Sequence, residues 1–343
     1  MEHVLITGGA GFIGTNMAQF HLKRGDAVYL FDNFSRKGSS DNIAWLKTIP
    51  AGSLQVFRGD VRNAEEIDQA VRSCSAVDRV YHLAGQVAVT CSLTDPREDF
   101  ESNAVGTFNV LEAVRCFAPE AAMVYASTNK VYGALDDVAV DELETRYMFR
   151  NLPFGISEEH PVDFHSPYGC SKGAGDQYVR DYARSYGLRA VVFRQSCIYG
   201  LRQFGVEDQG WIAHFCIALL RQKPITIFGN GKQVRDILWV DDLVAAYDAA
   251  CVRMDEVHGE IFNIGGGAEN TTSIWCEIAP HLETVTGVKP VVDYRPPRLG
   301  DQRIFVSDVR RAGERLGWAP TVGVEDGIGK LWHWISSNRE LFV

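Results

Sequence analysis

Residues 7–14 read Thr-Gly-Gly-Ala-Gly-Phe-Ile-Gly, between an apolar strand expected at 4–6 and a helix expected over 12–24. The glycines fit the pattern G-x-G-x-x-G and also its variant G-x-x-G-x-x-G. Such a turn lets backbone N–H groups approach a pyrophosphate, whose charge is favoured by the N-terminus of the following helix. The strand, turn and helix together predict a dinucleotide site that contains Gly8, Gly11, Phe12, Ile13 and Gly14.

A carboxylate follows the next predicted strand and indicates which dinucleotide binds. The apolar run 28–31 ends at Asp32, eighteen residues after the last glycine of the turn. A carboxylate there accepts hydrogen bonds from a ribose diol and repels a 2′-phosphate, which favours NAD. Arg36 and Lys37 follow closely and keep NADP open as an alternative.

Short apolar runs alternate with helical patterns through the first two hundred residues. The predicted strands are 4–6, 28–31, 54–57, 79–83, 123–126 and 190–194, and the predicted helices between them are 12–24, 64–73, 97–117 and 168–186. This order is typical of α/β proteins with a parallel sheet. We predict a Rossmann-type, doubly wound parallel sheet with a smaller C-terminal α/β domain that binds the substrate.

The pattern loosens after Gly200, where helices are expected near 211–221, 241–253, 273–286 and 325–338. We assign residues 1–199, with a return segment at about 237–264, to the dinucleotide-binding domain. Residues 200–236 and 265–343 are assigned to the substrate-binding domain. The long connection 134–167 is either a lid over the site or a passive surface excursion.

Composition and charge exclude several classes of function. The formal net charge of −10 argues against non-specific binding to nucleic acid or to a membrane surface. Eight scattered cysteines without a C-x-x-C pair form a poor disulfide or zinc framework. His160, Asp163 and His165 lack the spacing of metal ligands, so we expect no metal site. With the first strand starting at Val4 and no long apolar run, we expect a cytoplasmic protein.

Tyr168 and Lys172 are four residues apart, so they share one face of the predicted helix. A lysine ammonium beside a phenol is expected to lower the pKa of the tyrosine and to permit proton transfer near neutral pH. Thr128 follows a strand that is expected to end at the same place. We predict a catalytic trio of Thr128, Tyr168 and Lys172 that exchanges a proton with a substrate alcohol.

These features resemble the extended short-chain dehydrogenase/reductase family of nucleotide-sugar epimerases and dehydratases. The resemblance covers nearly the whole chain and includes the segments 103–107, 131–133, 229–236, 300–303 and 306–308. It implies a bound NAD that is recycled, a nucleotide-diphosphate sugar as substrate, and a homodimer or homotetramer. The cofactor contacts that position and resemblance imply, besides the first turn, are Asp32, Asn33, Asp60, Val61, Leu83, Ala84, Gly85, Gln86, Asn103, Tyr168 and Lys172.

The two residues that directly follow the predicted catalytic threonine distinguish the branches of this family from one another. Sugar 4,6-dehydratases carry an Asp-Glu pair there, whereas this chain has Asn129 and Lys130, so dehydration is disfavoured on chemical grounds. Residues 127–133, 163–172 and 208–211 resemble the branch that epimerises C2 of CDP-linked sugars. The alternatives are a 4-epimerase of UDP- or GDP-hexoses, a net dehydrogenase, and an NAD-binding sensor without catalysis.

The predicted substrate contacts follow from these segments. Arg235 and Arg303 are implied as diphosphate contacts, which explains how an acidic protein holds an anion. Gln86, Asn129 and Lys130 are expected to orient the sugar, although turn formation and a surface charge are equally plain explanations. The complete predicted set is Gln86, Asn129, Lys130, Arg194, Arg202, Gln209, Arg235 and Arg303.

Overall fold

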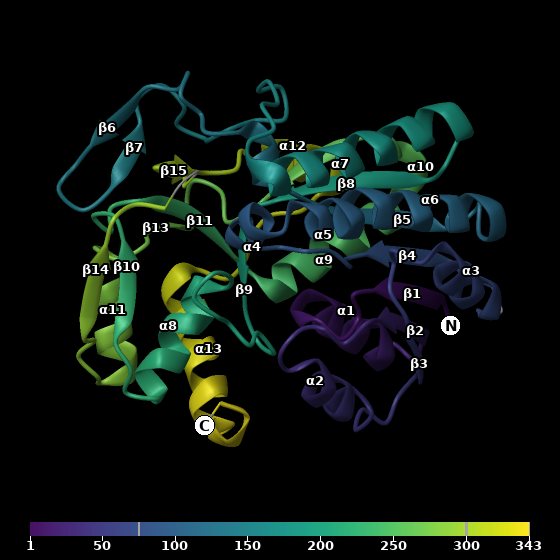
Figure 1. The fold of residues 1–343 in the computed structure, drawn as a ribbon, viewed down its shortest axis with the longest axis horizontal. Helices are drawn as coiled ribbons and strands as arrows, with labels where there is room; N and C mark the ends of the chain where they lie inside the picture. The colour runs from purple at the N-terminus through teal and green to yellow at the C-terminus, as the bar shows by residue number, and fades with distance from the viewer. Residues whose placement is uncertain (75, 299–300, 343) are drawn as a thin grey trace.

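The computed structural model describes residues 1–74, 76–298 and 301–342, and a seven-stranded parallel sheet forms its centre (Figure 1). The strand order is β12-β8-β5-β4-β1-β2-β3. The bounds are β1 His3–Thr7, β2 Ala27–Asp32, β3 Ser53–Arg58, β4 Arg79–His82, β5 Ala122–Thr128, β8 Ala190–Gln195 and β12 Ile261–Ile264. The predicted Rossmann-type fold is confirmed. The sheet contains all six predicted strands and a seventh, β12, which lies in the predicted return segment.

Helices cover both faces of this sheet, which explains why its strands are almost continuously apolar. One layer contains α1 (Phe12–Lys23), α2 (Ser39–Leu46), α9 (Val240–Val252), α10 (Met254–Val257) and α12 (Arg310–Leu316). The other contains α3 (Ala64–Ser73), α6 (Gly106–Phe117) and α7 (Ser166–Tyr186). Side chains of β1 enter both cores, since Val4 and Ile6 belong to one and Leu5 to the other.

The helix predicted over 97–117 is interrupted. The chain forms α4 (Val89–Thr94) and α5 (Pro96–Phe100), then a π-helical turn over Glu101–Val105, and only then α6. A π turn adds a residue to the helical repeat, so it changes the direction in which Asn103 points. This segment contacts α7, the helix that carries Tyr168 and Lys172, through α4, α5 and the π turn.

The second part of the molecule is built from small sheets and three helices. Its strands are β9 (Cys197–Tyr199), β10 (Ile225–Phe228), β11 (Val234–Trp239), β13 (Thr271–Ser273), β14 (Val292–Arg295) and β15 (Ile304–Phe305). Its helices are α8 (Trp211–Leu220), α11 (Ile278–Thr286) and α13 (Val324–Ser337), followed by a 3₁₀ turn at Arg339–Leu341. Helices α8, α11 and α13 share one apolar core with β10 and β11.

One predicted domain boundary differs from the observed packing. Residues 265–343 were assigned together to the substrate-binding part, yet α12 packs against β12 and α9 of the Rossmann part. Ala312, Leu316 and Trp318 belong to that apolar core. The apolar face of α12 therefore continues the Rossmann layer, while α13 returns to the second part.

The connection 134–167 forms a hairpin of β6 (Val140–Glu142) and β7 (Tyr147–Phe149) that packs on the second part (Figure 1). Phe149 and Ile156 are buried in a small core with residues of β11 and β15. Arg146 forms an ion pair with Glu277 at 2.7 Å, which fixes the hairpin to the start of α11. Among the helices that the structure describes, none is long and apolar enough to cross a membrane.

Candidate functional site

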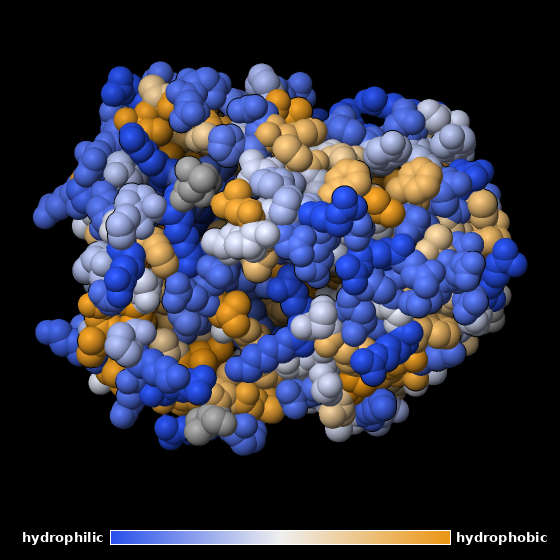
Figure 2. Space-filling view, in the orientation of Figure 1, coloured by the Kyte–Doolittle hydropathy of each residue, from blue (hydrophilic) through white to orange (hydrophobic). Residues whose placement is uncertain are grey.

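One cavity of about 770 Å³ lies at the carboxyl edge of the parallel sheet and continues between the two parts of the molecule. Figure 2 shows the surface hollowed near its centre, where these two parts meet. The glycine-rich turn, the ends of β2 to β5, the start of α7 and the loop 195–212 form the wall. Ligands of doubly wound sheets bind at this edge, so the position agrees with the predicted site.

The glycine-rich turn is built so closely that two of its glycines have no room for a side chain. A Cβ on Gly8 would lie 2.7 Å from the Ala84 nitrogen, and one on Gly14 would lie 2.4 Å from the Gly8 oxygen. Gly11 differs, because a Cβ there meets only the Gly8 oxygen at 3.2 Å and Gly11 lines the cavity. The turn thus presents bare backbone at the start of α1, as a bound pyrophosphate requires.

Asp32 ends β2 in the wall of the same cavity. Its carboxylate accepts hydrogen bonds from the backbone nitrogens of Ala10 at 2.9 Å and Phe34 at 2.7 Å. Burial raises the pKa of Asp32, and the two backbone hydrogen bonds oppose this rise. The side chain is fixed beside the glycine-rich turn, in the place where a ribose diol would be recognised. These residues fit a dinucleotide.

Fifteen of the sixteen predicted cofactor residues line the cavity, and Asn103 is the exception. Asn103 is fully buried, where its side-chain oxygen accepts from the Gln86 nitrogen at 2.9 Å. Its side-chain nitrogen donates to Asp99 at 3.2 Å and to Ser171 at 3.1 Å. Asn103 thus holds the loop 84–88 from behind, and its direct contact with the cofactor stays a prediction.

We expect Gly11→Val to fold but to lose its dinucleotide. Gly11 has φ −74°, which any residue can adopt, and the added methyl groups would fill the pyrophosphate position. NAD extracted from the purified variant should fall at least about tenfold, which corresponds to about 1.4 kcal/mol of binding free energy. The matched control is Gly323→Val, since Gly323 also begins a helix, at φ −69°, with no atom near its Cβ position. Equal NAD in both variants would contradict this assignment.

The predicted catalytic trio comes together in the cavity wall. Thr128 ends β5, whereas Tyr168 and Lys172 lie one turn apart on α7, and all three side chains are buried. A side-chain hydrogen bond joins Thr128 to the Tyr168 hydroxyl. The Lys172 ammonium lies 4.3 Å from the centre of the Tyr125 ring, which forms the floor beneath it.

The ionisation of this trio differs from the sequence-based expectation. Burial raises the pKa of Tyr168 to about 12, although the hydrogen bond from Thr128 lowers it. Burial also lowers the pKa of Lys172 to about 7, against the charges of Asp176 and Asp99. The expected lowering of the tyrosine pKa is absent because burial of the phenol outweighs the hydrogen bond from Thr128 and the charge of Arg36. A cationic ligand near the phenol would favour its ionised form.

Arg235 and Lys130 lie together on the substrate side of the cavity. Arg235 pairs with Asp301 at 2.6 Å and donates to the Gln302 carbonyl at 2.8 Å. Burial and the charge of Arg235 lower the pKa of Lys130 to about 8. Arg202 and Gln209 also line this side, and the Arg202 guanidinium stacks 4.0 Å from the Trp45 ring.

The side-chain amides of Asn129 and Gln86 are held by the protein. Asn129 donates to Gln302 at 3.2 Å. Gln86 donates to the Ala88 carbonyl at 2.7 Å and to Asp99 at 3.0 Å. Both residues line the cavity. Gln86 fixes its own loop, and contact of either side chain with a sugar stays a prediction.

Arg194 is held in a buried ion pair and does not line the cavity, so its contact with the substrate stays a prediction. Only 3% of it is exposed, and it lies outside the cavity wall. Its guanidinium binds both carboxylate oxygens of Asp176, at 2.8 and 3.1 Å, and the Tyr132 hydroxyl at 3.1 Å. Gln195 at the end of β8 lines the cavity, whereas the Arg194 side chain lies under α7 with Asp176.

Arg303 is likewise absent from the cavity wall, and its side chain is exposed. Asp301 and Arg298 line the cavity instead. The Arg298 guanidinium stacks 3.8 Å from the Phe228 ring and pairs with Asp208 at 2.9 Å. Sequence reasoning missed Arg298 because it lies in a Pro-containing loop, although it directly precedes the segment 300–303, and that closeness was an available signal.

The cavity is covered by a different segment from the one expected. No described residue of the connection 134–167 lines it, so the lid interpretation of that segment is not supported. Residues 202–212 line it instead. Asn16 of α1 donates to the Leu201 carbonyl at 2.9 Å, and Phe204 packs on Gly38, so this loop joins the two parts across the cavity.

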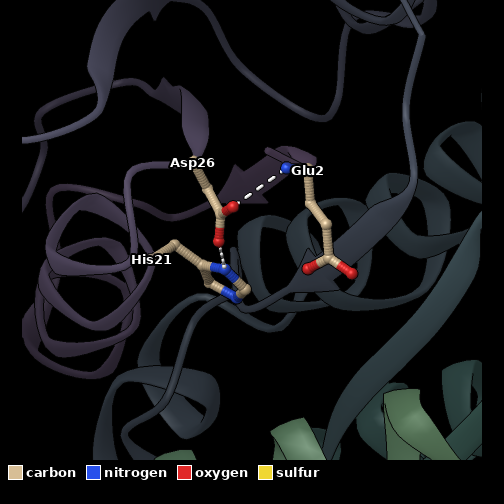
Figure 3. Close-up of side chains that lie close together, drawn as sticks. All are labelled: Glu2, His21 and Asp26. Atoms are coloured by element: carbon tan, nitrogen blue, oxygen red, sulfur yellow. Dashed lines mark hydrogen bonds and ion pairs between the residues drawn. The ribbon is translucent and has the colours of Figure 1, made fainter.

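Glu2, His21 and Asp26 form a cluster of three potential metal ligands within the described ranges (Figure 3). His21 Nδ1 and an Asp26 oxygen are 2.9 Å apart, and Asp26 also accepts from the Glu2 backbone nitrogen at 2.9 Å. Arg79 neutralises Glu2 at 2.8 Å. The cluster lies at the amino edge of the sheet, away from the cavity. We assign it to fixing the N-terminus.

Comparison with known proteins gives matches along nearly the whole chain. A family model described as GDP-mannose 4,6 dehydratase matches residues 5–331. The chain is 44% identical to a CDP-paratose 2-epimerase of Salmonella typhi over 97% of its length and 99% of that protein. It is 31% identical to a UDP-glucose 4-epimerase of Mycolicibacterium smegmatis, with coverage of 95% and 96%.

A solved structure is similar over the same extent. The UDP-glucose 4-epimerase of Thermus thermophilus, in complex with NAD, superimposes with a TM-score of 0.82 at 31% identity. The alignment covers 98% of this chain and 99% of that one. The likeness therefore includes both parts of the molecule.

Proposed function

The chain belongs to the NAD-dependent epimerase and dehydratase family of the extended short-chain dehydrogenases/reductases, and we propose that it is a 2-epimerase of a CDP-linked sugar. The proposed reaction converts CDP-paratose to CDP-tyvelose, the conversion that the relative of Salmonella typhi suggests by its name. The nicotinamide stays bound and is recycled. NAD itself is the cofactor of the family.

The residues after Thr128 carry this proposal. Asn129 and Lys130 line the cavity beside Thr128, where a dehydratase needs an acid and a base to remove water. Lys130, with a pKa of about 8, could exchange a proton, but the amide of Asn129 cannot, so the two residues do not form that acid–base pair. Oxidation followed by reduction of the same carbon needs neither of them, so the trio is sufficient for epimerisation.

The chain's own residues handle the proton in this mechanism. When bound, NAD supplies the hydride acceptor and then the hydride donor. The Tyr168 phenolate takes the proton from the substrate hydroxyl and later returns it, so one group serves as base and acid. Thr128, already hydrogen-bonded to Tyr168, holds the same substrate oxygen. Lys172 stabilises the phenolate, and Lys130 and Arg235 provide positive charge for the nucleotide diphosphate.

A 4-epimerase of a UDP- or GDP-hexose is the second candidate, since relatives with that name match along the whole chain. The two differ in which carbon faces the nicotinamide. Incubation with CDP-paratose, UDP-glucose and GDP-mannose, followed by NMR of each sugar, tests the choice. Inversion at C2 of the CDP sugar alone supports the first proposal, and inversion at C4 of a hexose replaces it with the second. Bound NAD without turnover on any sugar supports a sensor.

We propose that the protein is a homo-oligomer whose interface lies on α6 and α7. Phe108, Tyr178 and Tyr186 are exposed by 41, 49 and 59% on these two helices. Phe108 contacts Tyr178 edge to face at 5.9 Å, so the rings form one cluster. In Figure 2 apolar side chains come to the surface over this region. Exposed aromatic clusters are typical of interfaces between subunits.

The change Tyr178→Asp is expected to dissociate the oligomer, because it places a charge inside the aromatic cluster. Light scattering should report the mass of one chain at concentrations where the unchanged protein is larger. Tyr294→Asp is the control, since Tyr294 is 57% exposed on β14. Dissociation by both changes, or by neither, argues against this interface.

The cytoplasmic location stays a prediction, and all eight cysteines have free thiols.

A further inference from the structure

A buried carboxylate lies beneath the catalytic lysine and takes no part in the mechanism above. Asp99 belongs to α5 and is completely buried. It accepts hydrogen bonds from the Ser171 hydroxyl at 2.5 Å, the Gln86 amide at 3.0 Å and the Asn103 amide at 3.2 Å. Burial raises the pKa of Asp99, whereas the bonds from Ser171 and Gln86 and the charge of Lys172 oppose this rise. Three donors satisfy a carboxylate and favour its ionised form.

These three partners come from the elements that surround Lys172. Ser171 precedes it on α7, and Gln86 and Asn103 hold the loop that follows β4. A Cβ built on Gly85 would lie 4.0 Å from the Lys172 nitrogen, so this loop passes beside the ammonium. Asp99 therefore ties the lysine's helix to the loop that forms the opposite wall of the site.

The charges around Lys172 can be named element by element. Asp176 of α7 is the other carboxylate that favours its charged form, but Arg194 of β8 already pairs with it. Tyr125 of β5 presents its ring face, and His82 of β4 has a pKa lowered to about 3 by burial. Tyr168 and Asp99 complete the surroundings. Of the two carboxylates, Asp99 alone lacks an arginine partner among the described residues.

We propose that Asp99 is a positioning residue whose negative charge keeps Lys172 protonated and whose hydrogen bonds hold the Gly85–Gln86 loop against α7. The inference rests on the proposed function, because it assigns the lysine a task in the same proton transfer. In the buried site Lys172 loses its proton near neutral pH, with a pKa of about 7 even in the presence of Asp99. Without that charge the ammonium is lost at lower pH, and the phenolate loses its stabilisation.

The Asp99→Asn variant isolates the charge from the hydrogen bonds. The new amide can accept from Gln86 and Asn103 and donate to Ser171, which itself donates to the Tyr168 carbonyl at 3.2 Å. The Lys172 titration is followed by NMR of the purified protein with ¹³C-labelled lysine, and Lys172→Met assigns the signal. We expect the lysine to titrate about one pH unit lower or more in Asp99→Asn.

Catalysis gives an independent readout that a merely structural change does not move. The Asp99 charge also raises the pKa of Tyr168, so its removal lowers the pKa values of both groups. Both limbs of the pH profile of kcat/KM should therefore shift to lower pH. Glu101→Gln is the control, because Glu101 pairs with Arg97 at the surface, and it should leave both limbs in place.

An unchanged or higher Lys172 titration in Asp99→Asn overturns the inference. The NMR readout needs no turnover, so failure of the proposed reaction on every sugar is distinguished from failure of this inference. Should Asp99→Asn not fold, Asp99→Ser removes the same charge with a smaller polar side chain and is judged by the same shift.

Discussion

Tyr168→Phe is expected to lower turnover of the nucleotide sugar by about 10²- to 10⁴-fold, the usual contribution of a general acid–base group. Phenylalanine fills the same buried position but has no hydroxyl to share with Thr128. The cavity wall otherwise stays intact, so binding of NAD and of the sugar nucleotide should persist. Steady-state turnover and calorimetric binding measure the two quantities separately.

Tyr178→Phe is the matched control, because Tyr178 lies on the same helix but is 49% exposed away from the cavity. It removes the same hydroxyl without touching the site, and turnover should remain at the level of the unchanged protein. Turnover of Tyr168→Phe at that same level would remove the phenol from the mechanism. Lys172, with its pKa of about 7, would then be the remaining candidate for the proton transfer.

Arg194→Met is expected to destabilise the protein by about 3–5 kcal/mol, because it leaves a buried carboxylate without its cation. Asp176 is fully buried and would keep only the Ser127 hydroxyl, at 2.9 Å, and the neighbouring Gln177 amide as donors. Methionine has a similar apolar stem, so the change removes charge more than volume. Urea denaturation measures the loss.

The control for this change is Arg189→Met, just before the same strand. Arg189 pairs with Asp255, which is 85% exposed, and exposed ion pairs contribute little to stability. A stable Arg194→Met protein with a raised KM for the sugar nucleotide would instead support the predicted contact with the substrate.

The cofactor side of the site could be predicted from the sequence because backbone geometry dictates it. Only glycine fits at positions 8 and 14, and the carboxylate after β2 has a fixed place in a doubly wound sheet. The same is true of Tyr168 and Lys172, since a spacing of four on one helix brings both to the same face. In each case the local pattern and the fold determine the position together.

The substrate side could not be predicted with the same success, because it depends on tertiary packing. Arg194 and Arg303 lie close in sequence to cavity residues, yet one turns under α7 and the other points to solvent. Asp99 belongs to no motif, and its role depends on a π turn that the helical pattern of 97–117 conceals. The hairpin of 134–167 is long enough for a lid but packs elsewhere.

The most direct test of the proposed function follows CDP-paratose deuterated at C2 by NMR, with purified protein and no added nicotinamide. We predict that CDP-tyvelose appears up to an equilibrium mixture and keeps the deuterium at C2, because the same bound cofactor takes up and returns it. Product without deuterium at C2, or a stoichiometric release of reduced nicotinamide with a keto sugar, would contradict transient oxidation and return at that carbon.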